Sequence, residues 1–495
     1  MMDYNRAVRV RAAPAPSGSL HVGNVRTFLY NWLFARHTGG TFVLRIEDTD
    51  VSRFTEEAYR AVLEDLRWLG LDWDEGPEVG GAHEPYRQSE RRQFYLEAAG
   101  RLVGGGKAYR CYCTAGELKQ RREQAQAERR KPGYDGRCRR LTQEQVAAFE
   151  QEGRSYAVRF QVPDEGVLDY EDLVVGKIAT HLDQIDDFAI VRSDGAPLYH
   201  LAVVVDDGLM EINHVIRGDD LMSNTPKQIL LHEALGNAVP AFGHLPQVLG
   251  PDRKPLSKRH GSTSITDFRA GGYLPGALIN FLALLGWGTS DDTLLSRDEL
   301  VDRFEVRDVH SSPAMFDTKK LDWMNGEYIR MLDDCELAEL TQPFLAAEGL
   351  IDQPPSAVQA QNVQHAAPLI KTRMRRLSEA PGLVGGLFTR PEIDPAAAEK
   401  VLSVEHVPEL LRRASVGLAE IEPWGKEQVE AALRAIAEEM GLKPRKAFGP
   451  LYVAVSGTTV SAPVFDLIAL IGRQESLERL AIAEQLSREL SGAVT

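Results

Sequence analysis

The sequence lacks a hydrophobic run long enough to cross a bilayer. Its longest apolar stretch, residues 277–287, includes Asn280 and is much shorter than the roughly 20 residues of a membrane helix. The first residues, MMDYNRAVRVR, contain no apolar segment, so a secretory signal is not expected. Four cysteines in 495 residues are too few for a disulfide framework, which favours a reducing cytoplasm.

Positive charge is also in the minority. The formal net charge of −15 argues weakly against a nucleic-acid-binding protein, unless basic residues gather in local patches. There is no internal repeat and no low-complexity tract. Because the length exceeds what one hydrophobic core supports, about two to four domains are expected.

The N-terminal region contains the alternation of elements that starts a parallel sheet. Residues 8–12 predict a short strand, residues 25–33 repeat apolar side chains at helical spacing, and residues 41–46 predict the next strand. A strand, a glycine-containing turn, a helix and a strand form a βαβ unit, so a Rossmann-like α/β domain is predicted.

Later segments differ in character. Residues 110 to about 195 combine three cysteines, a basic run and short β-like pieces, which predicts a module inserted into the sheet domain. Apolar runs at 200–205 and 211–216 predict strands that resume the sheet, followed by a helix over 227–235. Beyond about residue 330 the composition predicts an all-helical domain.

Two segments have the composition of a phosphate site. The turn APAPSGSLHVGN at 13–24 places Gly18, Gly23 and His21 just before a helix N-terminus, where free N–H groups favour anions. A proline-rich turn with a surface histidine is the plainer interpretation of this stretch alone. The basic segment KPLSKRH at 254–260 is by itself most often a solvated loop. Together, the two could grip a triphosphate.

These segments resemble the class I aminoacyl-tRNA synthetases. PAPSGSLHVGN resembles the family's HIGH signature and PLSKR its KMSKS loop. Further motifs resemble the bacterial glutamyl-tRNA synthetases in particular, namely RIEDTD, LRWLGLDWDEGP, YHLAVVVDD, VIRGDD and LDWMNGEYI. The resemblance implies a multidomain protein in which an α/β Rossmann-like catalytic domain with an α+β insertion precedes an all-α anticodon-binding domain.

The resemblance and the shifts in composition predict five segments. These are a first catalytic half at 1–109, an acceptor-end-binding module at 110–197, a second catalytic half with the KMSKS-like loop at 198–261, a stem-contact segment at 262–332 and a helical anticodon-binding domain at 333–495. The implied activity is ATP-dependent ligation of L-glutamate to tRNA-Glu through a glutamyl-adenylate, with Mg²⁺ accompanying ATP. A cytoplasmic monomer is expected.

The resemblance also assigns residues to the site. ATP would contact Pro14, His21 and Gly23, with Asn24 completing the signature and Lys258 and Arg259 closing on the phosphates. Glutamate would be held by Arg11, Ala13, Ala15, Glu47, Tyr199 and Arg217. Glu47 would neutralise the substrate ammonium, and both arginines would fork onto carboxylates. Ala15 stands where the family usually has serine, so one hydroxyl contact is missing.

Three cysteines raise the question of zinc. Cys111, Cys113 and Cys138 match positions at which some family members bind zinc, but Arg140 stands where a histidine ligand would be. That leaves three thiolates and the Tyr134 hydroxyl, whereas structural zinc normally takes four cysteine or histidine ligands. A zinc site and three reduced cysteines both remain open.

Two basic patches suit a polyanionic partner. Residues 119–140 contain nine arginines or lysines against three acidic residues, and Lys371 and Arg373 belong to a second cluster. By resemblance, the first patch contacts the acceptor end of the tRNA and the second its anticodon. Arg373 matches a position at which discriminating enzymes carry arginine, which favours strict specificity for tRNA-Glu.

Four alternatives stay open from the sequence. One is a nucleotidyltransferase that adenylates a small acid without tRNA, and another is a catalytically silent RNA-binding protein. The third is a truncated paralogue that glutamylates a modified tRNA base, and the fourth is a non-discriminating ligase that also charges tRNA-Gln with glutamate. The helical C-terminal third argues against the first and third. The intact His21, Glu47, Arg217 and Lys258 argue against the second.

Overall fold

The chain divides into two compact units. In the computed structural model the first unit comprises residues 1–268 and 278–317, and the second comprises 269–277 and 318–495. The structure describes residues 7–16, 18–50, 54–129, 133–257, 259, 261–288 and 293–492. Among the helices so described, none combines the length and apolar character needed to span a bilayer.

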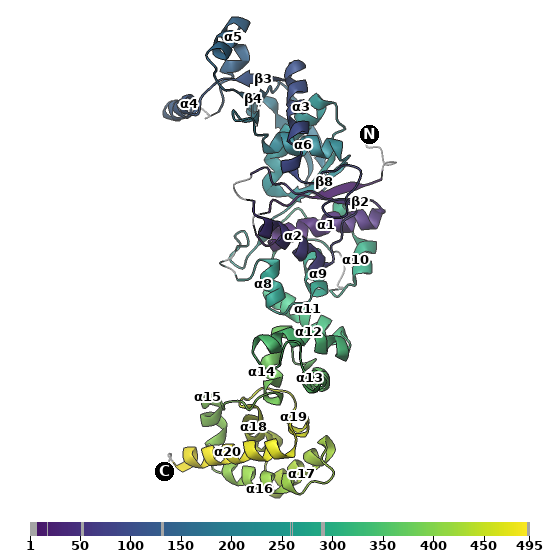
Figure 1. Cartoon of the computed structure of the whole chain (residues 1–495), viewed down its shortest axis with the longest axis vertical. Coiled ribbons are helices and arrows are strands. Elements are labelled where there is room, and N and C mark those ends of the chain that lie inside the picture. Colours follow the sequence, from purple (N-terminus) through teal and green to yellow (C-terminus); the bar gives the residue numbers. More distant parts are fainter. Residues whose placement is uncertain are drawn as a thin grey trace. The chain divides into compact units, whose positions relative to one another are not determined.

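Two sheets of mostly parallel strands lie at the centre of the first unit (Figure 1). Strand β1 pairs with β2 in parallel, and a second sheet has the order β6-β5-β9-β8, in which β8–β9 and β5–β9 are parallel. The backbone N–H of Asn213 donates to the carbonyl of Arg9 over 3.1 Å, which places β1 beside β8. The strands are β1 (Arg9–Ala12), β2 (Thr41–Leu44), β5 (Val167–Asp172), β6 (Gly176–His181), β8 (His214–Gly218) and β9 (Ala241–Leu245).

Helices cover these sheets. Helix α1 (Val22–Thr38) packs against β1, β2 and β8 and ends at Gly39, whose φ of 63° is the left-handed conformation that favours glycine. Further helices are α2 (Glu56–Leu69), α3 (Arg92–Gly104), α6 (Tyr199–Leu209), α7 (Thr225–Leu235) and α10 (Arg297–Arg303), and α8 (Ile265–Ala270) and α9 (Pro275–Ala283) have residues in both units. A short parallel pair, β10 (Val248–Leu249) and β11 (Ala314–Met315), completes the unit.

The inserted segment contributes to two sheets. An antiparallel sheet joins β3 (Ala108–Cys111), β4 (Ala157–Phe160) and β7 (Ala189–Val191), accompanied by α4 (Ala115–Ala127) and α5 (Gln143–Gln151). The hairpin β5–β6 instead pairs with β9. The predicted insert therefore supplies two strands of the central sheet.

The strand predicted over 200–205 is wrong, because these residues lie in helix α6. The run HLAVVV is apolar and β-branched, and a short apolar run does not distinguish a strand from a helix that is buried on all sides. Residues 201–207 are all buried. The strand predicted over 211–216 is confirmed in part, since β8 begins at His214.

All elements described from residue 318 onward are helical, which confirms the predicted all-α C-terminal region. These helices are α11 (Thr318–Met331), α12 (Asp334–Ala347), α13 (Ala357–Ile370), α14 (Ala380–Val384), α15 (Pro395–Ala397), α16 (Val407–Ala419), α17 (Lys426–Glu439), α18 (Pro444–Ser456), α19 (Val464–Ile471) and α20 (Arg473–Gly492). Two apolar clusters, centred on α12–α13 and on α16–α20, form the core of this unit.

Candidate active site

A cavity of about 620 Å³ lies at the carboxyl end of β1 and the N-terminus of α1. Ten of the residues predicted for the site line it, namely Arg11, Ala13, Pro14, Ala15, His21, Gly23, Asn24, Glu47, Tyr199 and Arg217. They come from the ends of β1, β2 and β8 and from the first turns of α1 and α6. This is the edge at which a doubly wound sheet binds its ligands.

His21 caps helix α1 and faces this cavity. Its Nδ1 accepts a hydrogen bond of 3.1 Å from the backbone N–H of Gly23, and burial lowers the pKa of the imidazole. The ring is therefore neutral near pH 7, and the hydrogen lies on Nε2. The first turn of α1 contains no acidic residue, so both the Nε2 hydrogen and the free helix N–H groups favour an anion.

The chain that follows the basic segment, at residues 263–265, is hydrogen-bonded to this turn. The N–H of Val22 donates to the carbonyl of Thr263 over 3.0 Å, and the N–H of Ile265 donates to the carbonyl of Leu20 over 2.9 Å. Pro255 and Leu256 of the basic segment also line the cavity, together with His21 and Gly23 of the turn. Arg259 does not line the cavity and lies 3.3 Å from Asp252, and Lys258 lies outside the described residues.

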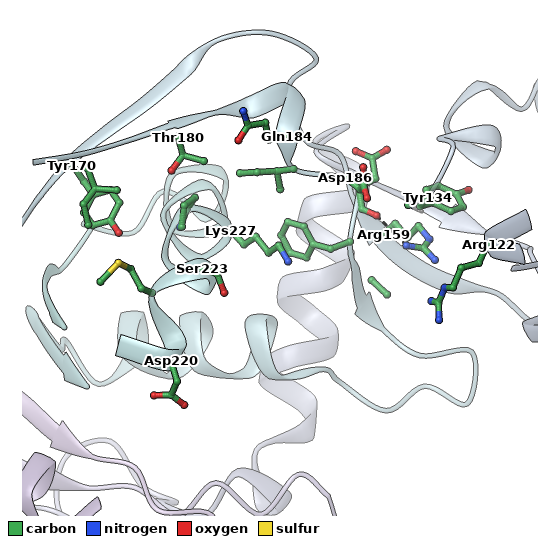
Figure 2. Close-up of a pocket in the computed structure, with 18 of the residues that line it drawn as sticks. Arg122, Tyr134, Arg159, Tyr170, Thr180, Gln184, Asp186, Asp220, Ser223 and Lys227 are labelled. Atoms are coloured by element: carbon green, nitrogen blue, oxygen red, sulfur yellow. Dashed lines mark hydrogen bonds between the residues drawn. The ribbon is translucent and has the colours of Figure 1, made fainter. Parts of the chain in front are cut away.

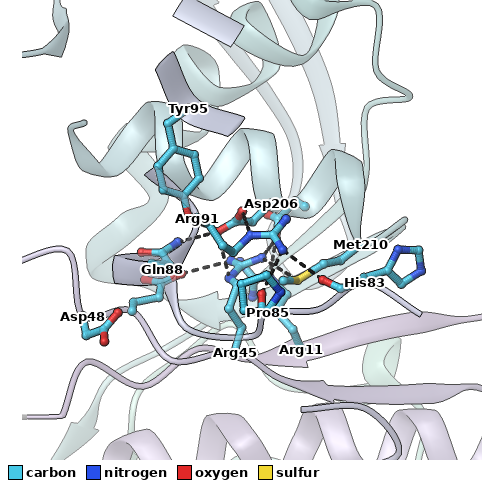
Figure 3. Close-up of polar contacts among 12 residues, drawn as sticks. Arg11, Arg45, Asp48, His83, Pro85, Gln88, Arg91, Tyr95, Asp206 and Met210 are labelled. Atoms are coloured by element: carbon cyan, nitrogen blue, oxygen red, sulfur yellow. Dashed lines mark hydrogen bonds and ion pairs between the residues drawn. The ribbon is translucent and has the colours of Figure 1, made fainter. Parts of the chain in front are cut away.

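A buried network of charges lies beside the part of the cavity that Arg11 and Glu47 line (Figure 3). Oδ1 of Asp207 accepts from Nη1 of Arg45 over 2.6 Å and from Nε of Arg11 over 3.2 Å. Nη2 of Arg45 donates to Oε1 of Glu47 over 3.0 Å. Asp207 therefore contacts Arg11 directly and is linked to Glu47 through Arg45. Arg11 was predicted to bind a carboxylate of the substrate and Glu47 its ammonium group.

The neighbouring Asp206 extends this network. Its carboxylate accepts from Nε of Arg91 over 2.6 Å, from the Tyr95 hydroxyl over 2.8 Å and from the Gln88 amide over 2.9 Å. All four side chains are buried. Because buried charges require such partners, the network fixes the end of α6 against β2 and α3.

Arg11 and Arg217 present different numbers of donors to the cavity. Arg11 uses Nε toward Asp207, and its two Nη groups have no partner within the described parts of the chain. Arg217 commits Nε, one hydrogen of Nη1 and both hydrogens of Nη2 to protein acceptors. With four of its five N–H groups used, Arg217 has one left for a ligand. The fork expected of both arginines therefore fits Arg11 only.

The electrostatics of Glu47 and Tyr199 follow from burial. Burial raises the pKa of Glu47, while Arg45 and Arg11 act in the opposite direction. Burial also raises the pKa of Tyr199, whose hydroxyl stays protonated and can donate. Tyr199 is the first residue of α6, not the residue before a strand as predicted.

The three cysteines of the insert cluster together. Their sulfur atoms lie within 4.8 Å of one another, with 3.5 Å between Sγ of Cys113 and Sγ of Cys138. Sγ of Cys111 lies 3.4 Å from the hydroxyl oxygen of Tyr134 and 3.3 Å from Nε of Arg159. The three sulfurs lie close enough together to bind one metal ion, and the Tyr134 hydroxyl beside Cys111 is a nearby fourth donor, whereas structural zinc normally takes four cysteine or histidine ligands.

In the helical unit, the two predicted tRNA contacts have different surroundings. Arg373 lines a cavity of about 740 Å³ together with Lys400 and Thr458, and its Nη1 donates to the Ser461 carbonyl over 3.0 Å. Lys371 does not line it. Its ammonium instead lies 3.1 Å from Asp334.

Comparison with known proteins agrees with this geometry. Residues 7–323 match the family model described as the catalytic domain of class I tRNA synthetases (E and Q), and residues 336–484 match an anticodon binding domain. The chain is 47% identical over 480 residues to glutamate–tRNA ligase of Symbiobacterium thermophilum, covering 96% of this chain and 99% of the relative. Identity to the ligase of Moorella thermoacetica is 44%, covering 97% and 99%. The chain belongs to the class I glutamate–tRNA ligases.

A solved structure of this family has the same fold. The crystal structure of a glutamate tRNA ligase from Elizabethkingia meningosepticum, in complex with its amino acid, superposes with a TM-score of 0.86 at 32% identity. The alignment covers 97% of this chain and 99% of that one. This confirms the predicted order of a Rossmann-like catalytic region followed by a helical anticodon-binding region.

Sequence reasoning missed the residues that hold the predicted site residues in place. Arg45 and Asp207 lie within the quoted motifs RIEDTD and YHLAVVVDD, but no role was predicted for either. Arg45 and Glu47 are two positions apart, a spacing that places extended residues on one side of the chain, and this signal was available. His244, which contacts Arg217, and Asp172, which contacts His244, had no signal in spacing.

Proposed function

We propose that the cavity at the start of α1 binds ATP and L-glutamate side by side and joins them to the 3′ end of tRNA-Glu. The observation that carries this proposal is the convergence of an anion-binding helix start with Arg11, Glu47 and Arg217 in one cavity. Membership of the glutamate–tRNA ligases supplies the reaction, and the geometry supports the role of each side chain.

Glutamate is held by charge complementarity. Glu47, fixed by Arg45, receives the substrate ammonium, while the two Nη groups of Arg11 form a fork that matches a carboxylate. Arg217 adds a single N–H and Tyr199 a hydroxyl. Glutamine carries an amide whose NH₂ would face these donors, and an arginine cannot give up its proton to relieve that mismatch.

ATP lies along the turn that carries His21. The neutral imidazole donates from Nε2 to a phosphate oxygen, and the free N–H groups of α1 favour the same charge. Lys258 is assigned to the phosphates by the family pattern of its loop. Mg²⁺ accompanies the nucleotide and offsets the phosphate charge.

The reaction then proceeds as two displacements. An α-carboxylate oxygen of glutamate attacks the α-phosphorus of ATP, and pyrophosphate leaves with the electron pair of the broken P–O bond. A hydroxyl of the terminal tRNA ribose next attacks the activated carbonyl, and AMP leaves. No side chain of the protein becomes covalently attached, so the protein contributes positioning and preorganised charge.

The acceptor end of the tRNA reaches this cavity along the insert. A second cavity, of about 930 Å³, is lined by cations and aromatic rings, among them Arg122, Arg159, Lys227, Tyr170 and Phe188, and also by four carboxylates, Asp186, Asp187, Asp219 and Asp220 (Figure 2). Cations and aromatic rings are the groups on which a single-stranded nucleic acid docks and stacks.

The resemblance to the family assigns the cavity lined by Arg373 to an anticodon base of the tRNA.

We further propose that Cys111, Cys113 and Cys138 hold Zn²⁺, with the hydroxyl of Tyr134 as the fourth ligand. The mutual approach of the sulfurs and the phenol oxygen supports this assignment. The ion would stabilise the fold of the insert and takes no part in the chemistry.

Aminoacylation of purified tRNA-Glu and tRNA-Gln, each with labelled glutamate and labelled glutamine, tests the proposed function. We expect ATP-dependent charging of tRNA-Glu with glutamate and of neither tRNA with glutamine. Charging of tRNA-Gln with glutamate would identify the non-discriminating form. Absence of any charging in the presence of ATP and Mg²⁺ would refute the proposal.

A further inference from the structure

Arg217 is held by buried acceptors at each nitrogen of its guanidinium. Its Nε donates to Nε2 of His244 over 3.2 Å, its Nη1 to the Gln228 amide oxygen over 2.7 Å, and its Nη2 to the Thr225 hydroxyl over 2.8 Å. These three partner side chains are at most 1% exposed. The guanidinium is thus fixed before any ligand arrives.

His244 is in turn fixed by Asp172. Nδ1 of His244 lies 2.6 Å from Oδ2 of Asp172, and neither side chain is exposed. Burial acts to raise the pKa of Asp172, but hydrogen bonds from His244 and from the backbone of Val175 and Val174 hold it below its ordinary value. An ionised carboxylate only accepts, so the hydrogen of His244 lies on Nδ1.

The contact with Asp172 determines which ring nitrogen of His244 can accept a hydrogen bond from Arg217. With Nδ1 protonated toward Asp172, Nε2 carries a lone pair, and it receives the Nε–H of the guanidinium. The hydroxyl of Thr225 lies 3.0 Å from the same nitrogen. The order Asp172, His244, Arg217 is therefore a directed chain of hydrogen bonds that ends at the glutamate cavity.

The chain begins in the insert. Asp172 is the last residue of β5, and its register partner is Phe242 of β9, two residues before His244. The same hairpin lines the second cavity through Tyr170 and Thr180 (Figure 2). One hairpin of the insert thus contacts both the proposed path of the tRNA end and the support of Arg217.

We infer that Asp172 and His244 are positioning residues for glutamate recognition. They act through Arg217, holding it so that its one remaining N–H faces the substrate, and so contribute to the discrimination of glutamate from glutamine. The inference rests on the proposed function, because it takes Arg217 as a ligand of glutamate. A guanidinium that is already oriented loses no conformational freedom when the substrate binds, whereas a displaced one lowers substrate affinity and the catalytic rate.

Two substitutions of His244 separate positioning from packing. In His244→Gln the amide oxygen takes the place of Nε2 and can accept from Arg217, whereas in His244→Asn the amide occupies the place of Nδ1 and leaves Arg217 without its acceptor. We expect His244→Asn to raise the KM for glutamate about 10- to 100-fold and to lower the preference for glutamate over glutamine. His244→Gln should stay within a few-fold of the parent, and the KM for ATP should change little in both.

Asp172→Asn tests the same inference independently of His244. The neutral amide no longer imposes the Nδ1 tautomer, so we expect a higher KM for glutamate with an unchanged KM for ATP. If Asp172→Asn does not fold, Thr225→Val replaces it. This substitution removes another acceptor of Arg217, and we expect it likewise to raise the KM for glutamate and leave the KM for ATP unchanged. Tyr86→Phe is the matched control, because it removes a buried hydroxyl bond to Glu75 and should leave both KM values unchanged.

The full-length enzyme is assayed by aminoacylation of tRNA-Glu, with Arg217→Gln as the reference. Equal KM values for glutamate in His244→Asn and His244→Gln, or a parental value in folded Asp172→Asn, would overturn the inference while the proposed function stands. If Arg217→Gln itself keeps the parental kcat/KM for glutamate, the role of Arg217 fails and the inference fails with it.

Discussion

Asp207→Asn is the substitution that most directly probes the buried network beneath the proposed glutamate site. Asp207 is fully enclosed between Arg45 and Arg11, and the change removes a negative charge while keeping almost the same shape. Two buried guanidiniums then share one neutral oxygen. Removing one partner of a buried ion pair typically costs about 3–5 kcal/mol, because an uncompensated charge is left behind.

The pKa of Asp207 gives an independent measure. Burial acts to raise it, but Arg11 and Arg45 lower it from 3.8 to about 2. Since one pKa unit corresponds to about 1.4 kcal/mol, ionisation of this carboxyl stabilises the folded state by roughly 2–3 kcal/mol. A depressed folded-state pKa stabilises above the unfolded value, so this contribution is complete above about pH 4 and is lost as the pH falls toward 2.

The measurement is urea unfolding followed by tryptophan fluorescence, together with steady-state aminoacylation. Four of the six tryptophans lie in the unit that carries Asp207, so the signal reports mainly on that unit. At pH 7.5 we expect Asp207→Asn to unfold at clearly lower urea, and its KM for glutamate to rise because Arg11 and Glu47 lose their common support.

Asp164→Asn is the matched control. Asp164 pairs with Arg139 through two hydrogen bonds, but its side chain is 80% exposed, and exposed pairs contribute little to stability. A parental unfolding midpoint and a parental KM for glutamate in Asp207→Asn would refute the argument that this carboxylate supports the site.

The remaining predictions concern the other parts of the site. Lys258→Ala should slow glutamate-dependent pyrophosphate exchange about 10²–10³-fold with nearly parental tRNA binding in a filter assay, and equal exchange rates would exclude its assigned role. Metal analysis of protein purified without a histidine tag should find about one zinc per chain, and Cys111→Ser with Cys113→Ser should lose the metal and weaken acceptor-end binding. Substoichiometric metal and unchanged activity after chelation would leave the cysteines as core residues. Arg373→Gln should raise charging of tRNA-Gln relative to tRNA-Glu, with an unchanged ratio arguing against an anticodon contact.

The first βαβ unit was predictable because its signals are local. The apolar alternation of 8–12 and the helical spacing of 25–33 correspond to β1 and α1, and the turn between them carries His21 as its cap. The order of strand, turn and helix was therefore enough to predict that residues of this turn line the cavity.

The error at 200–205 had a physical cause. These residues are apolar and β-branched, which favours a strand locally, but α6 is buried along most of its length and its last turn carries Asp206 and Asp207 into the arginine network. Tertiary burial overrode the local preference. The bonds to Arg45 and Arg91 also explain why the apolar helix α6 carries two aspartates near its C-terminal end.

The support of Arg217 could not be predicted from the sequence. His244 and Asp172 are 72 positions apart, and the pairing of β5 with β9 that brings them together joins the insert to the central sheet. The sequence pattern instead indicated a separate module. Parallel pairing between distant strands leaves no signal in composition or in short-range spacing.

The central claim is that fixed positive charge in this cavity distinguishes glutamate from glutamine. The most direct measurement is the ratio of kcat/KM for glutamate to that for glutamine in aminoacylation of tRNA-Glu, for the parent and for Arg217→Gln. An unpaired buried donor costs about 1–3 kcal/mol and more when it is charged, so the parent should show a large ratio. The variant should lose most of its activity with glutamate and show a much smaller ratio. A variant that keeps the parental kcat/KM for glutamate would contradict the account.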